Sequence, residues 1–148
     1  MIRPATLDDF EGVFALGLRR ALGSKRYESQ RIEREASKRA FVNMTSSPMI
    51  VGLVSTDDYG LIVGYVSGCV SPQWFNDDMT ASMLWLMAEK GHGAALLDAF
   101  EQACINRGAK EIVLRIGYGE RPEVYARKFK QKGYRMAGAN FLKEVNHA

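Results

Sequence analysis

A short glycine-containing turn, Lys90-Gly91-His92-Gly93-Ala94, constrains the fold of this chain more than any other segment. An apolar run that ends at Met87 precedes it, and apolar residues at helical spacing follow it as far as Gly108. This pattern predicts a strand, a turn and a helix in direct succession. Glycines let the backbone approach an anion closely, and the first turn of a helix adds free N–H groups and a positive dipole end. The turn is therefore a candidate site for a phosphate group.

The segment after the turn predicts the clearest helix of the chain. Its apolar residues form a single stripe, made of Leu96, Leu97, Phe100 and Cys104. Gly108 suits a left-handed C-terminal cap, and residues 111–116 then read as a strand. A strand, a crossover helix and a second strand within about thirty residues form a βαβ unit. The two strands of that unit should be parallel and joined by a right-handed connection.

The rest of the chain predicts helices and strands on either side of this unit, in the order β-α-α-β-β-β-α-β-α-β. After a first helix that opens near Asp9, the other elements are expected at residues 2–6, 29–44, 49–54, 61–66, 80–87, 122–133 and 134–145. The chain of 148 residues is long enough to bury a core by itself, so residues 1–148 are expected to form a single α/β domain.

Composition argues against several classes of protein. A net charge of +3 is too small to indicate nucleic-acid binding by itself. Cys69 and Cys104 lie far apart and the two histidines are scattered, so no metal site is expected. No apolar run is long enough to span a bilayer, and the N-terminus lacks the apolar segment of a signal peptide. We therefore expect a cytoplasmic protein.

Three motifs together resemble the GNAT superfamily of acetyl-CoA-dependent N-acetyltransferases. They are the opening Ile2-Arg3-Pro4-Ala5-Thr6, the Gly91-His92-Gly93 turn before the long helix, and Gly133-Tyr134 before the last expected strand. The resemblance covers nearly the whole chain, and the stretch from Trp74 to Gly93 is similar to small phage-encoded members. It implies a transferase with an α/β (α+β) fold, in which helices flank a mixed, mostly antiparallel sheet.

The same resemblance implies where acetyl-CoA would bind. In this family the fourth and fifth strands splay apart, and the pantetheine arm lies between them. The backbone at Trp85 and Met87 would then face pantetheine, and an amide near Met87 would polarise the thioester carbonyl. The pyrophosphate would lie on the turn formed by Lys90, Gly91, His92, Gly93 and Ala94.

Two positions depart from the family pattern. The family places Arg or Gln three residues before the first glycine, where this chain has Ala88. Lys90 can supply positive charge nearby, but as a point charge and without the planar fork of a guanidinium. The family also has a tyrosine in the last helix where this chain has Phe129, which cannot protonate a leaving thiolate. These departures leave the activity open.

Two residues are candidates for the proton transfers. Tyr125 lies four residues before Phe129, on the same helix face, and could serve as the general acid. It could equally belong to the core stripe. Asp78, with Asp77 beside it, could accept the proton of an arriving amine, although Asn-Asp-Asp is also a common turn sequence. Ser82 and Tyr118 are weaker polar candidates.

Several other residues allow more than one interpretation. His92 is expected to act through its backbone, and Glu89 is expected to point into solvent. Trp74 and Phe75 could line an acceptor pocket, bury into the sheet or pair two subunits. Basic residues are concentrated in the last helix and its exit; they are Arg127, Lys128, Lys130, Lys132 and Arg135. These could be a solvated face or could attract the phosphates of CoA.

The sequence therefore predicts direct transfer of an acetyl group from acetyl-CoA to a primary amine, without a covalent enzyme intermediate. The acceptor, a small molecule or a protein, is not identified by the sequence, and a homodimer is possible. The alternative is a catalytically impaired GNAT-fold module that binds CoA or a protein partner.

Overall fold

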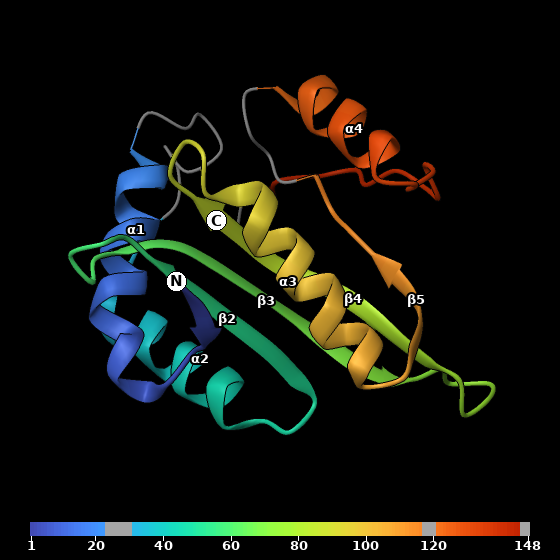
Figure 1. Ribbon diagram of the computed structural model, residues 1–148, viewed down its shortest axis with the longest axis horizontal. Helices are drawn as coiled ribbons and strands as arrows, with labels where there is room; N and C mark the ends of the chain where they lie inside the picture. The colour runs from blue at the N-terminus through green and yellow to red at the C-terminus, as the bar shows by residue number, and fades with distance from the viewer. Residues whose placement is uncertain (23–30, 117–120, 146–148) are drawn as a thin grey trace.

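The computed structural model describes residues 1–22, 31–116 and 121–145. A five-stranded sheet with the strand order β1-β2-β3-β4-β5 forms its centre (Figure 1). The strands are β1 (Ile2–Pro4), β2 (Ile50–Thr56), β3 (Ile62–Pro72), β4 (Met79–Ala88) and β5 (Ala109–Val113). Neighbouring strands are antiparallel except for β4 and β5, which are parallel.

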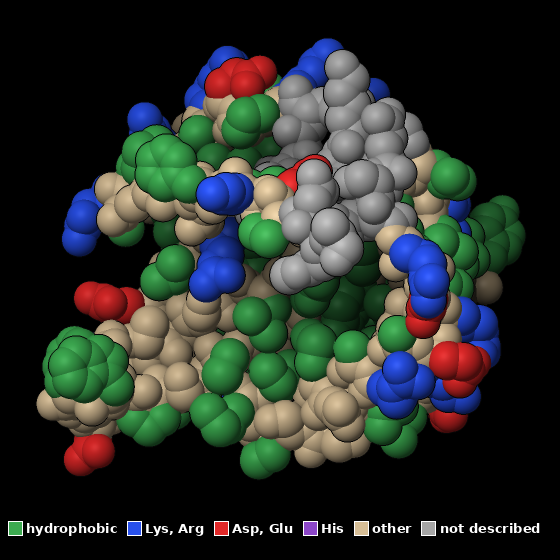
Figure 2. Space-filling view, turned by 180° about the vertical axis from the view of Figure 1, so that it is seen from behind, with side chains coloured by type: hydrophobic (Ala, Val, Ile, Leu, Met, Phe, Trp, Pro, Cys, Tyr) green, Lys and Arg blue, Asp and Glu red, His purple; other side chains and the backbone are tan. Residues whose placement is uncertain are grey.

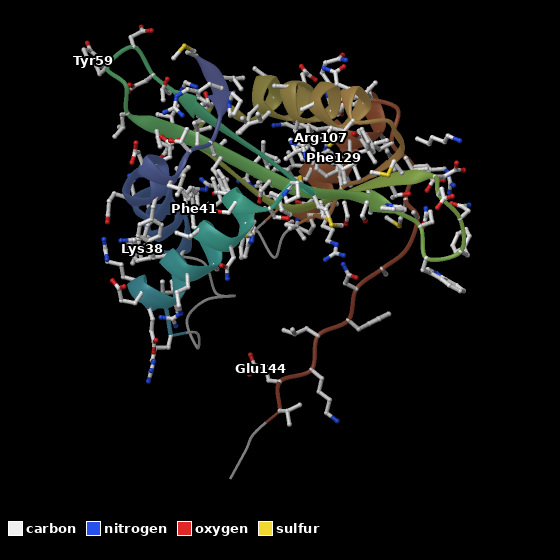
Figure 3. All side chains as sticks on the ribbon, turned by 90° about the horizontal axis from the view of Figure 1, so that it is seen from below. Lys38, Phe41, Tyr59, Arg107, Phe129 and Glu144 are labelled. Atoms are coloured by element: carbon white, nitrogen blue, oxygen red, sulfur yellow. The ribbon has the colours of Figure 1, made fainter. Side chains whose placement is uncertain are left out.

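Helices cover both faces of the sheet, as Figures 1 and 3 show. After a short 3-10 helix (Leu7–Asp9), α1 (Phe10–Ala21) and α2 (Arg34–Ser46) pack on one face. The opposite face carries α3 (Gly93–Asn106) and α4 (Pro122–Gln131). The βαβ unit β4-α3-β5 predicted from the sequence is confirmed, and so is the mixed, mostly antiparallel α/β fold.

A separate apolar core lies on each face of the sheet. Under α3, Leu96 and Phe100 are fully buried against Val66 of β3. Under α1 and α2, aromatic rings meet, and Phe41 of α2 lies 5.9 Å from the ring of Tyr65 in β3. Each core packs against one face of the sheet. Side chains of β4 contribute to both cores, so this strand is packed on both faces.

The element boundaries differ from the prediction in three places. The second helix starts at Arg34, and residues 23–30, which include part of the predicted helix, lie outside the described residues. The fifth strand begins at Ala109 because Gly108, with φ of +87°, reverses the chain immediately before it. The predicted last strand is wrong in this structure, since residues 134–145 form no strand. A strand needs a partner edge, and this segment leaves the body of the domain after Tyr134 (Figure 3).

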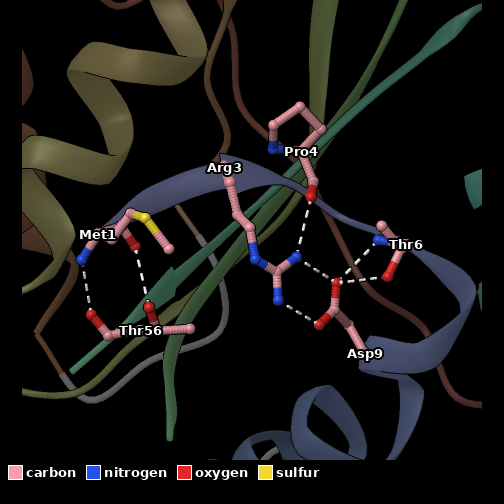
Figure 4. Close-up of polar contacts among 6 residues, drawn as sticks. All are labelled: Met1, Arg3, Pro4, Thr6, Asp9 and Thr56. Atoms are coloured by element: carbon pink, nitrogen blue, oxygen red, sulfur yellow. Dashed lines mark hydrogen bonds and ion pairs between the residues drawn. The ribbon is translucent and has the colours of Figure 1, made fainter. Parts of the chain in front are cut away.

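The carboxylate of Asp9 links β1 to the start of α1 through hydrogen bonds (Figure 4). The guanidinium of Arg3 donates to both of its carboxylate oxygens, at 2.8 and 2.7 Å. The backbone N–H of Thr6 donates to the same carboxylate at 2.8 Å, as in a capping box. The Arg3 hydrogen bonds hold the pKa of Asp9 below its ordinary value, although burial opposes this. The buried carboxylate is therefore fully paired in its charged form.

We expect this carboxylate to make folding sensitive to acid. Because its pKa is lower in the folded chain, its contribution is complete above the unfolded value of about 4 and is lost as pH falls through the lower folded value. Asp9→Asn should lose about 2 kcal/mol of stability at pH 7. Urea unfolding between pH 2 and 7 measures both effects. Asp8→Asn, an exposed neighbour, is the control, and equal losses in the two variants would contradict the role of Asp9.

Candidate active site

The two parallel strands diverge and leave an opening between them. Pairing of β4 with β5 runs from Met79 only to Ser82, which lies opposite Val113. From Met83 to Ala88, no described strand lies beside β4 on that side. Figure 1 shows β5 and the chain after it turning away from β4. The splayed strands that the family resemblance implied are thus present in this fold.

A β-bulge in β4 lies where the divergence begins. Ser67 of β3 pairs with Trp85, whereas the next residue of β3, Gly68, pairs with Met83. Leu84 is therefore the extra residue of β4. A bulge bends its strand and increases the local twist, so it directs the second half of β4 away from β5. The opening thus follows from one inserted residue.

The pairing of β4 with β3 decides which backbone groups face the opening. The N–H of Glu89 donates to the carbonyl of Val63 at 2.8 Å, across the β3 ladder. In an antiparallel pair every second residue points its N–H and C=O at the partner, so Met87 and Trp85 also face β3. The backbone groups of Leu86 and Ala88 point the other way, into the opening. The outward-facing backbone groups thus belong to Leu86 and Ala88, the residues on either side of Met87, whereas those of Trp85 and Met87 face β3.

The side chains of Met87 and Trp85 lie on the face that carries α1. A Cβ added at Gly17 of α1 would lie 3.6 Å from the Sδ atom of Met87, an ordinary van der Waals contact, so α1 passes directly over this side chain. Trp85 is 47% exposed. Seen from the side opposite α3, hydrophobic side chains gather on the part of the sheet that the helices leave open (Figure 2). The opening therefore has an apolar wall on the α1 side.

The glycine turn lies at the end of β4 and leads directly into α3. Gly91 has φ of +92°, a left-handed conformation that favours glycine, and no atom lies within 4 Å of the position of an added Cβ. The His92 N–H closes the turn on the carbonyl of Glu89 at 3.1 Å. His92 is the N-cap of α3 and makes no side-chain cap. The first-turn amides of α3 are thus left without partners within the helix, beside open space at Gly91.

Glu89 does not simply point into solvent, because it forms an ion pair with Arg19 of α1. The Nε atom of Arg19 lies 3.0 Å from Oε1 of Glu89. Arg19 also donates to the carbonyl of Ile62 at 3.4 Å. The pair compensates the negative charge next to the turn, which would otherwise oppose an anion. Sequence reasoning missed Arg19, which lies 70 positions from Glu89 and belongs to no local motif.

The last helix places Tyr125 and Phe129 on one face, as predicted. Phe129 is buried in the core under α3, and its ring lies 6.3 Å from that of Tyr125. Tyr125 is 38% exposed, so it is not enclosed in the core as Phe129 is. Tyr134, the other tyrosine near this helix, donates a hydrogen bond to Glu101 at 2.7 Å, and burial together with that carboxylate raises its pKa. Tyr134 therefore has a structural role, packing on the core and bonding to Glu101.

Asp78 is not brought to the turn. It precedes β4, whereas the turn follows that strand of ten residues, which spans about 30 Å. Its carboxylate pairs with Lys110 at 2.6 Å. Trp74, at the same end, is 93% exposed and stacks edge-to-face on Phe75. Ser82 lies within β4 and is half-buried, and Tyr118 lies outside the described residues. The structure therefore separates this end from the opening.

Other reactive groups in the described part of the chain form no second centre. Cys104 is buried, and this burial raises the pKa of its thiol to about 11, so it behaves as a core residue. Among the described residues, no group of three His, Cys, Asp or Glu side chains could hold a metal. No described helix has the length and apolar character needed to cross a membrane.

We compared the chain with family models, curated protein sequences and solved structures. No family model and no curated protein sequence matches the chain. Solved structures do match it over almost its whole length. A transcriptional regulator from Bacillus halodurans has a TM-score of 0.79 at 20% identity, over 98% of this chain and 99% of that one. A GNAT family acetyltransferase from Staphylococcus aureus has a TM-score of 0.66 at 18% identity, over 98% of both chains.

An aminoglycoside acetyltransferase from an uncultured soil sample is similar as well, with a TM-score of 0.68 at 18% identity, over 99% of this chain and 98% of that one. At 18–20% identity, these likenesses show that the backbones of the proteins share one arrangement. The strand order, the divergence of β4 from β5 and the turn before α3 are parts of that arrangement. The chain therefore has the fold of the GNAT acetyltransferases.

Proposed function

We propose that this protein transfers an acetyl group from acetyl-CoA to a primary amine. The observation that carries the proposal is the opening between β4 and β5, which ends at the Gly91 turn and the first turn of α3. An extended chain fits beside the free backbone groups of Leu86 and Ala88, and a pyrophosphate fits the turn. The likeness to solved acetyltransferases supports the same reaction.

The residues of the turn would hold the phosphates. The backbone amides from Gly91 to Ala94 supply directed donors, and Lys90, which is exposed, supplies a positive charge. Leu86 and Ala88 would bind the amides of pantetheine, and one of their N–H groups would donate to the thioester oxygen. Acetyl-CoA, when bound, supplies an activated acyl group. The side chains of Trp85 and Met87 would shield it on the α1 side.

Tyr125 is the proposed proton donor. Attack by a neutral amine forms the C–N bond and breaks the C–S bond, so the departing sulfur needs a proton and the new amide must lose one. Tyr125 carries the only side-chain hydroxyl of α4 and lies one turn before Phe129, the position of the missing family tyrosine. Because Asp78 lies at the other end of β4 and pairs with Lys110, we assign the removal of the amine's proton to solvent.

The experiment is release of free CoA thiol from acetyl-CoA in the presence of polyamines, amino acids, aminoglycosides and lysine peptides. Tyr125→Phe should lower the turnover rate of any accepted amine by roughly 100-fold and leave acetyl-CoA binding unchanged. Tyr59→Phe is the matched control, because Tyr59 is 95% exposed at the tip of the β2–β3 hairpin. An unchanged rate in Tyr125→Phe would remove this residue from the mechanism.

A second candidate function is a CoA-binding module without catalysis. Burial of Phe129 favours it, because the usual tyrosine of the family is replaced by a core side chain. This module would be stabilised by acetyl-CoA and would release no thiol with any amine of the panel. The same experiment therefore separates the two functions.

A further inference from the structure

A cavity of about 210 Å³ lies where the end of α2 meets β2 and the chain that follows β1. Its walls include Ala5, Thr45, Gly52 and Tyr65. Gly52 leaves the cavity open, because a Cβ at this position would meet only the Cβ of Ala5, at 3.7 Å. A space of this size holds about seven water molecules. It therefore suits a small organic molecule.

The wall that β3 contributes to this cavity is polar. Tyr65 lines the cavity and is only 4% exposed. Burial raises the pKa of its hydroxyl, which therefore keeps its proton and can donate. Ser67, the next residue on the same face of β3, pairs with Gly52 and is fully buried. Its Oγ atom has no hydrogen-bond partner among the described residues, although buried hydroxyls nearly always have one. The packing of the sheet thus leaves hydrogen-bonding capacity unused at this wall.

Arg107 is the one charged side chain among the described residues that line the cavity. Its Nη1 atom donates to the carbonyl of Pro48 at 2.8 Å, which places the guanidinium beside the start of β2. None of the ion pairs within the described ranges includes this arginine. Thr45 and Ser47 add two half-buried hydroxyls. The described lining therefore combines one cation with three hydroxyl groups and contains no carboxylate.

We propose that this cavity binds a small monocarboxylate that carries a hydroxyl or keto oxygen, such as a hydroxy acid. The planar guanidinium of Arg107 would pair with the carboxylate, and the hydroxyl of Tyr65 would donate to the second oxygen group. Phosphate, which carries more charge, fits less well. The cavity lies at the C-terminal ends of α2 and α3, which Ser47 and Arg107 cap, and the helix dipoles are negative there.

The proposed site is separate from the opening assigned to acetyl-CoA. Ser67 pairs with Gly52 on one side and with Trp85 of β4 on the other. The strand that lines the cavity and β4 are thus two strand spacings apart, about 10 Å. No described residue of β4 or of the turn at residues 90–94 lines the cavity. The carboxylate and acetyl-CoA should therefore bind independently of each other.

Titration of the isotope-labelled 148-residue chain, followed by the amide signals in NMR spectra, tests the proposal. The probes are lactate and 4-hydroxybenzoate, each compared with its carboxamide, and inorganic phosphate. We expect the two acids to shift the amide signals of Ser47, Gly52 and Arg107, with dissociation constants near about 1 mM. The carboxamides should bind at least about 10-fold more weakly, because they lack the charge that pairs with Arg107. Saturating acetyl-CoA should leave these constants unchanged.

Two variants connect the binding to the cavity. Arg107→Gln should weaken binding of the acids by at least about 10-fold, and Tyr65→Phe, which keeps the buried ring, by about 3- to 10-fold. Arg39→Gln is the control, because Arg39 is an exposed arginine of α2 that does not line the cavity, and it should change nothing.

The proposal is overturned if neither acid binds with a dissociation constant below about 10 mM. It is also overturned if the carboxamides or phosphate bind as tightly as the acids, or if Arg107→Gln and Arg39→Gln bind them equally. Competition between the acids and acetyl-CoA would place the acids in the opening and would likewise overturn it. Because none of these measurements uses acetyl transfer, their outcome is independent of the proposed reaction.

Discussion

Gly91→Asp is expected to abolish the stabilisation of this protein by acetyl-CoA. At a hundred times its dissociation constant, a ligand of the folded state adds about 2.7 kcal/mol of stability, which raises the midpoint of thermal unfolding by several degrees. An aspartate at position 91 fills the open space in front of the turn and places a negative charge where a phosphate would bind. The thermal midpoint should therefore stop responding to acetyl-CoA.

The control for this variant is Gly60→Asp. Gly60 has φ of +82°, and no atom lies within 4 Å of the position of an added Cβ, so the substitution has the same backbone cost and the same charge. It lies in the turn between β2 and β3, outside the turn formed by residues 90–94. Both variants should lose roughly 1 kcal/mol of intrinsic stability. A response to acetyl-CoA that survives in Gly91→Asp would place the phosphate elsewhere.

Gly68→Ala is expected to destabilise the fold by at least about 2 kcal/mol. A Cβ at this position would lie 2.5 Å from the Cζ atom of Phe100 and 2.7 Å from the carbonyl oxygen of Ser82. Phe100 is fully buried in the core, and the carbonyl belongs to the backbone of β4, so neither can move without cost. Urea unfolding measures the loss.

Gly52→Ala provides the comparison in the neighbouring strand. There a Cβ would meet only the Cβ of Ala5, at an ordinary 3.7 Å, so the variant should be neutral or slightly stabilising. Adding Phe100→Leu to Gly68→Ala should recover part of the loss, since it removes the nearer of the two contacts. If Gly68→Ala and Gly52→Ala have equal stabilities, close packing at Gly68 is not what fixes α3 on the sheet.

The βαβ unit was predictable because each of its signals is local. The apolar stripe through Phe100, the cap at Gly108 and the turn at Gly91 each act within a few residues, and the structure contains all three features. The expected strand over residues 134–145 failed for the opposite reason. Its composition favours a strand, but a strand exists only beside a partner, and composition does not supply one.

The candidate site was predictable in outline and not in detail. The turn and the divergence of β4 from β5 followed from the motif and from the family resemblance. The bulge at Leu84 and the ion pair of Arg19 with Glu89 depend on residues far apart in the chain. Asp78 was chosen for its chemical type, and the structure places it at the end of β4 opposite the turn.

The divergence of β4 from β5 leaves the central sheet unfinished. From Met83 to Ala88, β4 is paired with β3 alone among the described strands, and the backbone groups of Leu86 and Ala88 have no strand partner. A half-strand of this kind opens locally at lower free energy than the doubly paired strands beside it. A ligand that pairs with these backbone groups, as we propose for acetyl-CoA, is therefore expected to slow local opening of this half of β4.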